Sequence, residues 1–253
     1  MASTVIGCRQ IAKQFGHVQA LRDATVTVAP GEVVALVGDN GAGKSTLLKT
    51  LLGINRPDSG EVVINDEAVT LHSVRDAQAK GVDAVHQDLA LAPDLSVVDN
   101  MFLGHELLKP GLGSRLGVLG RRQMAEQARE ALRELSIVLP SLTVSIRELS
   151  GGQRQAVAVA RAVMWSRTAV LMDEPTAALG ARQSQIVCDL MRTVAARGLG
   201  VLVVSHDLPR ILKAADTITV LWRGETVLRA PAKDLTVPDL VAIMVGYKAG
   251  SAA

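Results

Sequence analysis

The stretch VGDNGAGKSTLLKT, residues 37–50, places a glycine-rich loop between two apolar runs. Before the loop, VVALV (Val33–Val37) is a continuous apolar run of the kind found in buried strands. After it, STLLKTLL (residues 45–52) has helical spacing and stops at Gly53. The stretch therefore predicts a strand, a loop of bare backbone and a helix, in that order.

The loop fits the pattern G-x-x-x-x-G-K-[ST] from Gly38 to Ser45. Glycines let neighbouring N–H groups converge on an anion, and the helix start adds the positive end of its dipole. Lys44 then supplies a point charge for the β- and γ-phosphates of a nucleotide, and Ser45 offers a hydroxyl to Mg²⁺. The alternative is a glycine-rich turn with a surface lysine. The residues assigned to the nucleotide are Gly38, Asp39, Asn40, Gly41, Ala42, Gly43, Lys44, Ser45 and Thr46.

An acidic pair follows a second apolar run, in AVLMDEPTAAL, residues 169–179. Asp173 and Glu174 come at the carboxyl end of this predicted strand, where ligands of parallel sheets bind. Asp173 is suited to hold Mg²⁺ through its water shell, and Glu174 to orient or deprotonate an attacking water. Taken alone, such a pair is often only solvated. Beside a phosphate-binding loop, a catalytic role is favoured.

Strand and helix signals alternate along most of the chain, which predicts a largely parallel sheet covered by helices. The N-terminal part alternates in the strand manner before a turn at Pro30 and Gly31. Composition changes after Leu89, and we expect residues 89–166 to form an inserted, mainly helical lobe within a single domain, residues 1–253. Further predicted elements are strands at residues 61–65, 81–87, 169–172 and 201–205, helices at 124–136, at 182–197 and after Leu208, and a hairpin at 218–229.

Bulk composition excludes several classes of protein. No apolar run approaches the roughly 18 residues that a membrane helix needs, and the first residues show no apolar segment behind a basic start. We therefore expect the chain in the cytoplasm, where Cys8 and Cys188 are most simply reduced thiols. A formal charge of +2 and 2% aromatic residues give no case for binding nucleic acid.

A second glycine-containing helix start occurs in LSGGQRQAVAVARAVMW, residues 149–165. Ser150 is suited to cap this helix, and Gly151 and Gly152 leave its first N–H groups accessible, followed by Gln153. The chain thus has a second helix start that is able to bind an anion. As an isolated string, Ser-Gly-Gly is more often a plain cap or loop.

The phosphate-binding loop, LSGGQ, the acidic strand and a later histidine, in this order, resemble the ATP-binding subunit of an ABC transporter. The resemblance covers nearly the whole chain and implies an ATPase that uses ATP and Mg²⁺. It also implies that two copies meet head to tail, so that residues 150–153 of one face the γ-phosphate bound by residues 38–46 of the other. ATP would then hold the copies together, and hydrolysis would release them. The residues assigned to the partner's nucleotide are Ser150, Gly151, Gly152 and Gln153.

The resemblance assigns roles to four further residues. Phe15, with Val18 beside it, matches the aromatic residue that stacks on adenine. Gln87 matches the glutamine that senses Mg²⁺ and water next to the lobe that faces the membrane partner. His206 matches the histidine that contacts the γ-phosphate and positions the water. Without the resemblance, a lone phenylalanine is usually core, Gln87 is a surface residue and His206 is structural.

One position departs from the family pattern. Where many relatives have aspartate after the acidic strand, this chain has Ala178-Leu179-Gly180. The contact that this aspartate makes across the dimer is therefore not carried over, and the coupling between the two ATP sites is left open.

Residues 87–104, with GDNGAGKS and GGQRQAVAVARA, resemble the branch that imports monosaccharides with a periplasmic sugar-binding protein. Only one phosphate-binding loop and one LSGGQ are present, so the expected functional unit is two copies of the chain. We expect an ATPase subunit that powers monosaccharide uptake through a separate permease, at the cytoplasmic face of the inner membrane. The alternatives are transport of another cargo, such as lipid, peptide or drug, and a soluble ABC ATPase outside transport.

Overall fold

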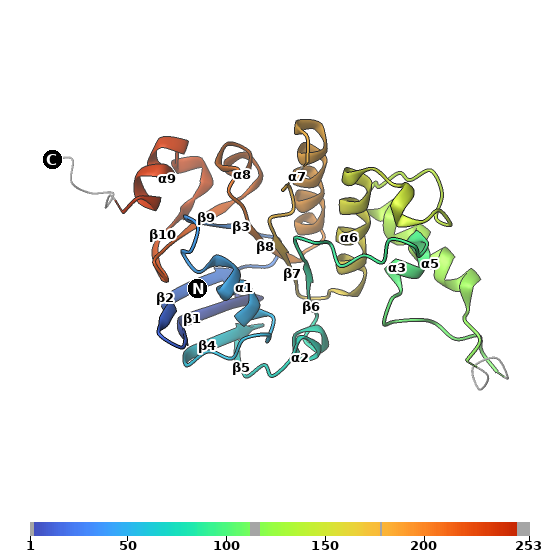
Figure 1. Cartoon of the computed structure of the whole chain (residues 1–253), viewed down its shortest axis with the longest axis horizontal. Helices are drawn as coiled ribbons and strands as arrows, with labels where there is room; N and C mark the ends of the chain where they lie inside the picture. The colour runs from blue at the N-terminus through green and yellow to red at the C-terminus, as the bar shows by residue number, and fades with distance from the viewer. Residues whose placement is uncertain (1–2, 112–116, 178, 247–253) are drawn as a thin grey trace.

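The computed structural model describes residues 3–111, 117–177 and 179–246. These residues form a ten-stranded sheet in the order β5-β4-β1-β2-β10-β9-β3-β8-β7-β6, with helices on both faces (Figure 1). The strands are β1 Ile6–Phe15, β2 Val18–Val28, β3 Val33–Val37, β4 Ser59–Ile64, β5 Glu67–Val69, β6 Val82–Val85, β7 Ala169–Asp173, β8 Gly200–Val204, β9 Thr217–Trp222 and β10 Glu225–Pro231. The α-helices are α1 Lys44–Leu51, α2 Val74–Ala79, α3 Val97–Met101, α5 Arg121–Glu134, α6 Gly151–Trp165, α7 Ala181–Ala196, α8 Leu208–Ala214 and α9 Val237–Met244.

Strand β3 is buried on both faces, as its continuous apolar run predicts. Because side chains alternate along a strand, Val33, Ala35 and Val37 share a core with the apolar residues of α6, α7, α8 and α9. Val34 and Leu36 face the other way and pack with α1 and with strands of the N-terminal sheet. The strand that leads into the glycine loop is therefore fixed from both sides.

The predicted α/β class is confirmed. Strands β6, β7, β8, β3 and β9 pair in parallel, whereas β1 pairs antiparallel with both β2 and β4. Hairpin β9–β10 closes the parallel part, and most predicted element ends differ from the observed ones by one or two residues. The sequence reading did not place α2 and α3, which are too short for a periodic signal.

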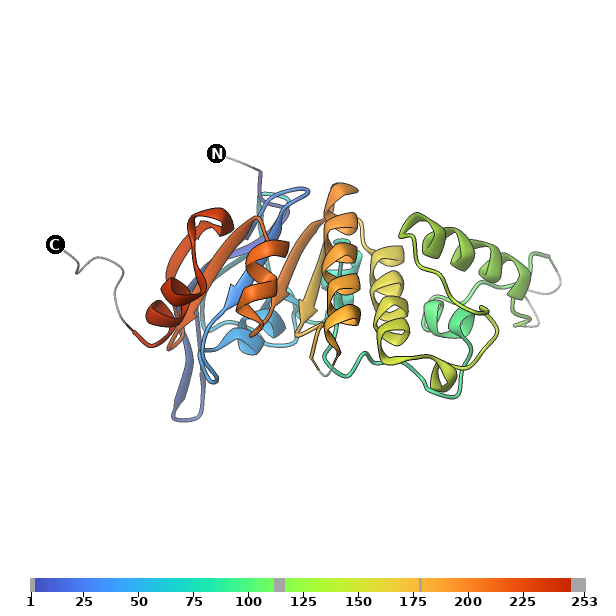
Figure 2. The same ribbon diagram turned by 90° about the horizontal axis from the view of Figure 1, so that it is seen from above.

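The helices between β6 and β7 extend from one end of the molecule, beyond the edge strand β6 (Figures 1 and 2). Helix α6 packs against α3 and α5, and it also packs against α7 and β6. It therefore joins the helical part to the sheet, instead of belonging only to one of them. The lobe boundaries at residues 89 and 166 stay a prediction.

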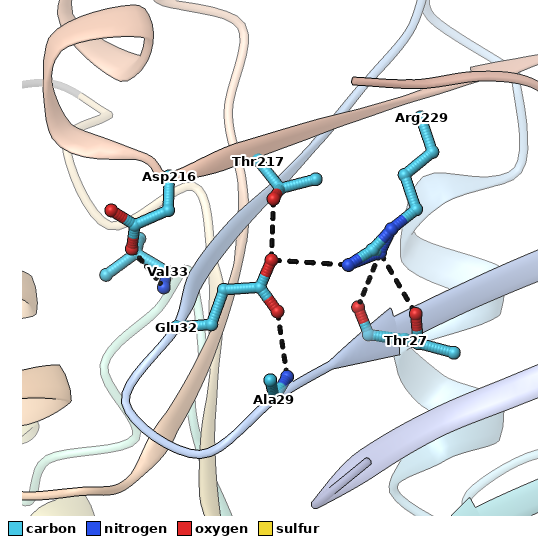
Figure 3. A network of polar contacts seen from close by, with 7 residues as sticks. All are labelled: Thr27, Ala29, Glu32, Val33, Asp216, Thr217 and Arg229. Carbon is cyan, nitrogen blue, oxygen red and sulfur yellow. Dashed lines mark hydrogen bonds and ion pairs between the residues drawn. The ribbon is translucent and has the colours of Figure 1, made fainter. Parts of the chain in front are cut away.

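A polar network ties the turn before β3 to the β9–β10 hairpin (Figure 3). The Glu32 carboxylate accepts hydrogen bonds from Ala29 N at 2.8 Å and Thr217 Oγ1 at 2.6 Å, and it pairs with Arg229 Nη2 at 3.2 Å. Arg229 also donates to Thr27 O and Oγ1. Every charge in this network thus has a protein partner, at the edge of the sheet where β3 and β9 begin.

Asp216, one residue before β9, also ties the start of β3 to neighbouring elements. Its carboxylate accepts a hydrogen bond from Val33 N at 2.8 Å and pairs with Arg192 of α7 at 2.5 Å. We call the side chains of Glu32, Arg192, Asp216, Thr217 and Arg229 the anchor network.

Candidate nucleotide-binding site

The register of the parallel strands brings four chain segments to one edge of the sheet. Leu36 of β3 and Asp173 of β7 both pair with Val204 of β8, and Val85 of β6 pairs with Met172 of β7. The residues that follow these strands therefore meet at the carboxyl edge of β3, β8, β7 and β6, which we call the nucleotide edge. They are the loop from Gly38, the residues from Ser205, the Asp173–Glu174 pair and the residues from His86.

The glycines of the loop are required for two different reasons. A Cβ at Gly38 would lie 2.3 Å from Leu221 O, and one at Gly43 would lie 2.6 Å from Ala20 O, so these two positions are closed by backbone. Gly41 has open space around it, but its φ is +81°, which an L side chain rarely adopts. The loop is thus packed tightly underneath and left open at Gly41.

Lys44 lies inside this loop with 8% of its surface exposed. Its Nζ donates to Gly38 O at 2.8 Å and to Asp39 O at 2.9 Å, so two backbone carbonyl groups of the loop bind the ammonium. Burial lowers the pKa of Lys44, and the charges of Glu174, Asp39 and Asp173 oppose that shift. An ammonium carries three protons, and in the described residues two of them are used here.

Helix α1 begins directly at Lys44, and its first turn contains no acidic residue. Its positive end is therefore available to an anion from outside the chain. Ser45 is exposed and Thr46 is half-buried in this first turn, where their hydroxyls adjoin the loop. The residues predicted for the phosphates thus form one continuous cradle.

The acidic pair is held next to this cradle. Burial raises the pKa of the Asp173 carboxyl, and the neighbouring Glu174 raises it further, against the charges of Lys49, His86 and Lys44. Glu174 has a left-handed φ of +48°, and its N–H donates to Val204 O at 3.0 Å. Backbone strain at non-glycine residues is enriched at functional sites, although this chain also has it at other positions, such as Asn65 and Ser136.

His206 lies beside Glu174. Its Nδ1 is 3.4 Å from Glu174 Oε2, and 68% of the histidine side chain is exposed against 25% of the glutamate side chain. The predicted general base and the imidazole are thus adjacent at the solvent-facing side of the nucleotide edge, and their catalytic roles stay a prediction.

Gln87 is exposed just past β6, on the same edge. His86 precedes it and, by register, lies opposite Asp173, on whose pKa it acts. Lys49 of α1 acts on the same carboxyl. The sequence alone does not single out His86 or Lys49, because their proximity to Asp173 depends on strand pairing and on the direction of α1.

The β1–β2 hairpin presents the two residues predicted for adenine. Phe15 ends β1 and is 46% exposed, and Val18 begins β2 and is 66% exposed. Lys13 Nζ lies 5.4 Å from the centroid of the Phe15 ring. Phe15 is therefore not a core residue, and its ring is accessible to a base; the stacking role stays a prediction.

The LSGGQ segment caps helix α6 as the sequence predicts. Gln153 N donates to Ser150 Oγ at 3.3 Å, and Ser150 N donates to Gln153 Oε1 at 2.9 Å, which makes a capping box. A Cβ on Gly152 would lie 2.8 Å from Gln183 Cγ. Packing against α7 therefore favours a small residue there, apart from any contact with a nucleotide. Ser150 itself is exposed.

Gly180 caps the start of α7, with its N–H donating to Gln183 Oε1 at 2.9 Å. Its φ of −67° suits any residue, so backbone geometry does not explain the glycine that replaces aspartate. Ala178, which belongs to the same departure, lies outside the described residues.

The chain does not bring LSGGQ to its own phosphate-binding loop. Helix α6 packs on β6, and β3 is three strands away across β7 and β8, a separation of roughly 14 Å at the usual strand spacing. Figure 1 shows α6 on the far side of α7 from α1. The nucleotide edge thus gathers Lys44, Asp173, Glu174, His206 and Gln87, and leaves Ser150 apart.

Known proteins resemble this chain over nearly all of its length. The chain is 42% identical over 246 residues to the fructose import ATP-binding protein FrcA of Rhizobium meliloti. This alignment covers 96% of this chain and 95% of that protein. It is 40% identical to the xylose/arabinose import ATP-binding protein XylG of Sulfolobus acidocaldarius, over 98% and 96% of the two chains. It also matches 46% of the length of the ribose import ATP-binding protein RbsA 2 of Rubrobacter xylanophilus, at 39% identity.

Solved structures show the same fold. An ATP-binding cassette of an ABC transporter in its ADP conformation superposes with a TM-score of 0.82 at 26% identity, covering 97% of this chain and all of that one. A dimeric bacterial ABC transporter cassette superposes with a TM-score of 0.71 at 25% identity, covering 90% and 98%. The model of the ABC transporter family matches residues 21–177. On these grounds, and with the nucleotide edge described above, the chain belongs to the ABC transporter family as an ATP-binding ATPase subunit.

Proposed function

We propose that this ATPase powers the uptake of a monosaccharide through a separate membrane permease. The relatives that match it nearly end to end are named for the import of fructose and of xylose or arabinose. Within the described ranges, no helix combines the length and apolar character that crossing a bilayer needs. In this proposal, based on the import systems for which the relatives are named, other chains form the transport path, this subunit acts peripherally on the cytoplasmic face, and a periplasmic sugar-binding protein delivers the cargo.

The observation that carries the two-copy arrangement of the ATPase is the separation of Lys44 from Ser150. The nucleotide edge offers a cationic cradle and an acidic pair, but α6 packs on β6, three strands from β3, so its capped start lies apart from the phosphate-binding loop of the same chain. Ser150 at that start is exposed and therefore open to a second molecule. We therefore infer that Ser150, Gly151, Gly152 and Gln153 complete the site of a second copy, as in a head-to-tail dimer.

Mg²⁺ fits the same edge. Burial and the neighbouring Glu174 raise the pKa of the Asp173 carboxyl. In the described residues this carboxylate has no hydrogen bond or ion pair. A cation beside it would therefore favour its charged form. Among these residues no three His, Cys, Asp or Glu side chains group as a metal site. Mg²⁺ needs no such group, because it uses one or two carboxylates together with phosphate and water oxygens. Ser45, Asp173 and Gln87 would hold it.

In this arrangement each predicted site residue has a defined role. Lys44 and the loop bind the phosphates, and Phe15 with Val18 supports the base. Glu174 takes the proton of the attacking water, and His206 orients Glu174 and the γ-phosphate at a distance of 3.4 Å from the carboxylate.

Mixing two inactive variants tests the dimer. Ser150→Arg blocks one half of the site and Lys44→Ala removes the other, so only a heterodimer contains one intact composite site. We expect ATPase activity in the mixture above the sum of the separate variants. If no mixing ratio restores activity, the arrangement across two copies is wrong.

The cargo is tested separately. The subunit should co-purify with a permease of several membrane spans, and a sugar-loaded binding protein should stimulate its ATPase activity. Stimulation only by lipid, peptide or drug would overturn the monosaccharide proposal and leave the ATPase unaffected.

A further inference from the structure

The loop after Gln87 has an unusual backbone. Leu89 and Ala90 are consecutive non-glycine residues in the left-handed region, with φ values of +60° and +45°. Leu89 N donates to His86 O at 2.9 Å, which closes the loop over Gln87. L side chains adopt this conformation only where the surroundings impose it, so an external restraint is required.

Arg161 of α6 supplies that restraint. Its Nη1 donates to Ala90 O at 2.7 Å and its Nη2 donates to Leu89 O at 3.0 Å. The two nitrogens of one rigid guanidinium thus hold the carbonyls of both left-handed residues, whereas a lysine would have to reach both carbonyls from a single nitrogen. Asp83 of β6, the strand that leads into the loop, acts on Arg161 with its opposite charge.

The same helix is fixed at its carboxyl end. Trp165 Nε1 donates to Met101 O at 2.9 Å, and its indole packs edge-on against Phe102 and is stacked with His105. Helix α6 is therefore one continuous segment of 15 residues, with Ser150 capping one end and the tryptophan anchored at the other. Arg161 lies between the two, against the Gln87 loop.

We infer that Arg161 is a positioning residue, which holds the Gln87 loop in the conformation that presents Gln87 to the nucleotide edge and joins that loop to the helix of LSGGQ. The inference rests on the role proposed above for Gln87. Because α6 is a single helix, a displacement of Ser150 by a partner's nucleotide is transmitted to Leu89 and Ala90 through one side chain. Arg161 is not among the residues assigned to the nucleotide, and it acts through the Gln87 loop.

Two substitutions test this tether in the full-length chain. Arg161→Met removes both hydrogen bonds, and Arg161→Lys keeps the charge with a single donor group. We expect kcat to fall about 10- to 100-fold in Arg161→Met, because small displacements of catalytic groups have effects of this size. The KM for ATP should stay within about twofold, since the cradle around Lys44 is untouched, and Arg161→Lys should recover only part of kcat. Arg122→Met on α5, whose side chain is 94% exposed, is the matched control and should behave as the parent protein.

Hydrogen–deuterium exchange separates positioning from simple stability. In Arg161→Met, amides of residues 86–91 should exchange faster, while residues 38–46 and the core strands keep the parent rate. Parental exchange at residues 86–91, or parental kcat, would overturn the inference, and so would faster exchange throughout the core. Gln87→Ala distinguishes the two proposals: if that variant keeps full kcat, the role of Gln87 fails, whereas the exchange experiment still tests whether Arg161 holds the loop.

Discussion

Carboxylates lie at both edges of the parallel sheet, where the strands begin and where they end, but the two edges differ in how these carboxylates are paired. In the anchor network, Glu32 and Asp216 are paired with arginine and with backbone or hydroxyl donors (Figure 3). At the nucleotide edge, Asp173 and Glu174 lie side by side, and in the described part of the chain neither forms an ion pair with lysine or arginine. Lys44, the nearest buried cation, is bonded to carbonyl groups instead.

This difference separates a structural cluster from a functional one. The anchor network leaves no charge for a ligand to satisfy, so its contribution is to hold the β9–β10 hairpin and α7 against the start of β3. The nucleotide edge keeps opposite charges close together without pairing them, which costs stability and prepares the site for an anion and a cation from outside.

The largest expected effect is that of Lys44→Ala at the nucleotide edge. We expect ATPase activity to fall by about 10²–10³-fold or more, because the variant lacks the buried charge that is proposed to bind the transferred phosphate. Circular dichroism and the melting temperature should stay close to those of the parent, since the ammonium pairs only with loop carbonyls. Full ATPase activity in this variant would remove Lys44 from its role.

Glu32→Gln should produce the opposite pattern at the anchor network. The amide keeps the shape but has one oxygen instead of two, so its NH₂ group faces either the N–H of Ala29 or the donors of Thr217 and Arg229, and partly buried groups are left unsatisfied. We expect a loss of about 1–3 kcal/mol in the free energy of unfolding, or about 2–4 °C in Tm for each kcal/mol. The kcat should be unchanged. A large drop in kcat at unaltered Tm would show that this network is not merely structural.

Asp173→Asn should change stability less than Glu32→Gln does, and the sign of its effect is distinctive. Because the folded-state pKa of Asp173 is raised above its unfolded value, the folded protein binds the proton more tightly, and stability falls as pH rises through the interval between the two values. The neutral amide avoids this loss. Without nucleotide, the variant should therefore melt slightly higher than the parent at pH 7, by about 2–4 °C for each kcal/mol gained.

At a pH below the unfolded value, near 4, the difference in Tm between Asp173→Asn and the parent should shrink, because Asp173 is then protonated in both states. If the variant and the parent have equal melting temperatures at both pH values, the charged Asp173 carboxylate does not destabilise the folded state.

The parts of the site that the sequence predicted are those determined by residues close together in the chain. The strand at Val33–Val37, the glycine loop and the cap at Ser150 each follow from neighbouring residues, and the structure contains all three. The apolar run at residues 169–172 was enough to place Glu174 at the carboxyl end of a strand, whereas His206 was singled out only through the family resemblance.

The parts that the sequence did not predict depend on pairing between distant segments. His86 lies opposite Asp173 only because β6 and β7 pair with Val85 against Met172. The left-handed Leu89 and Ala90 are set by Arg161, which is 71 positions beyond Ala90. No periodicity marks such a contact, because it joins a loop backbone to a helix side chain across the fold.

The central claim is that ATP binds between two copies of this chain. Glu174→Gln should slow hydrolysis without weakening nucleotide binding, since the amide keeps the size of the carboxylate. Size-exclusion chromatography with light scattering, in saturating ATP and Mg²⁺, is the most direct test. We predict that Glu174→Gln elutes as a dimer, and that adding Ser150→Arg or chelating Mg²⁺ returns it to a monomer. A Glu174→Gln chain that remains monomeric while its nucleotide site is saturated would contradict the claim.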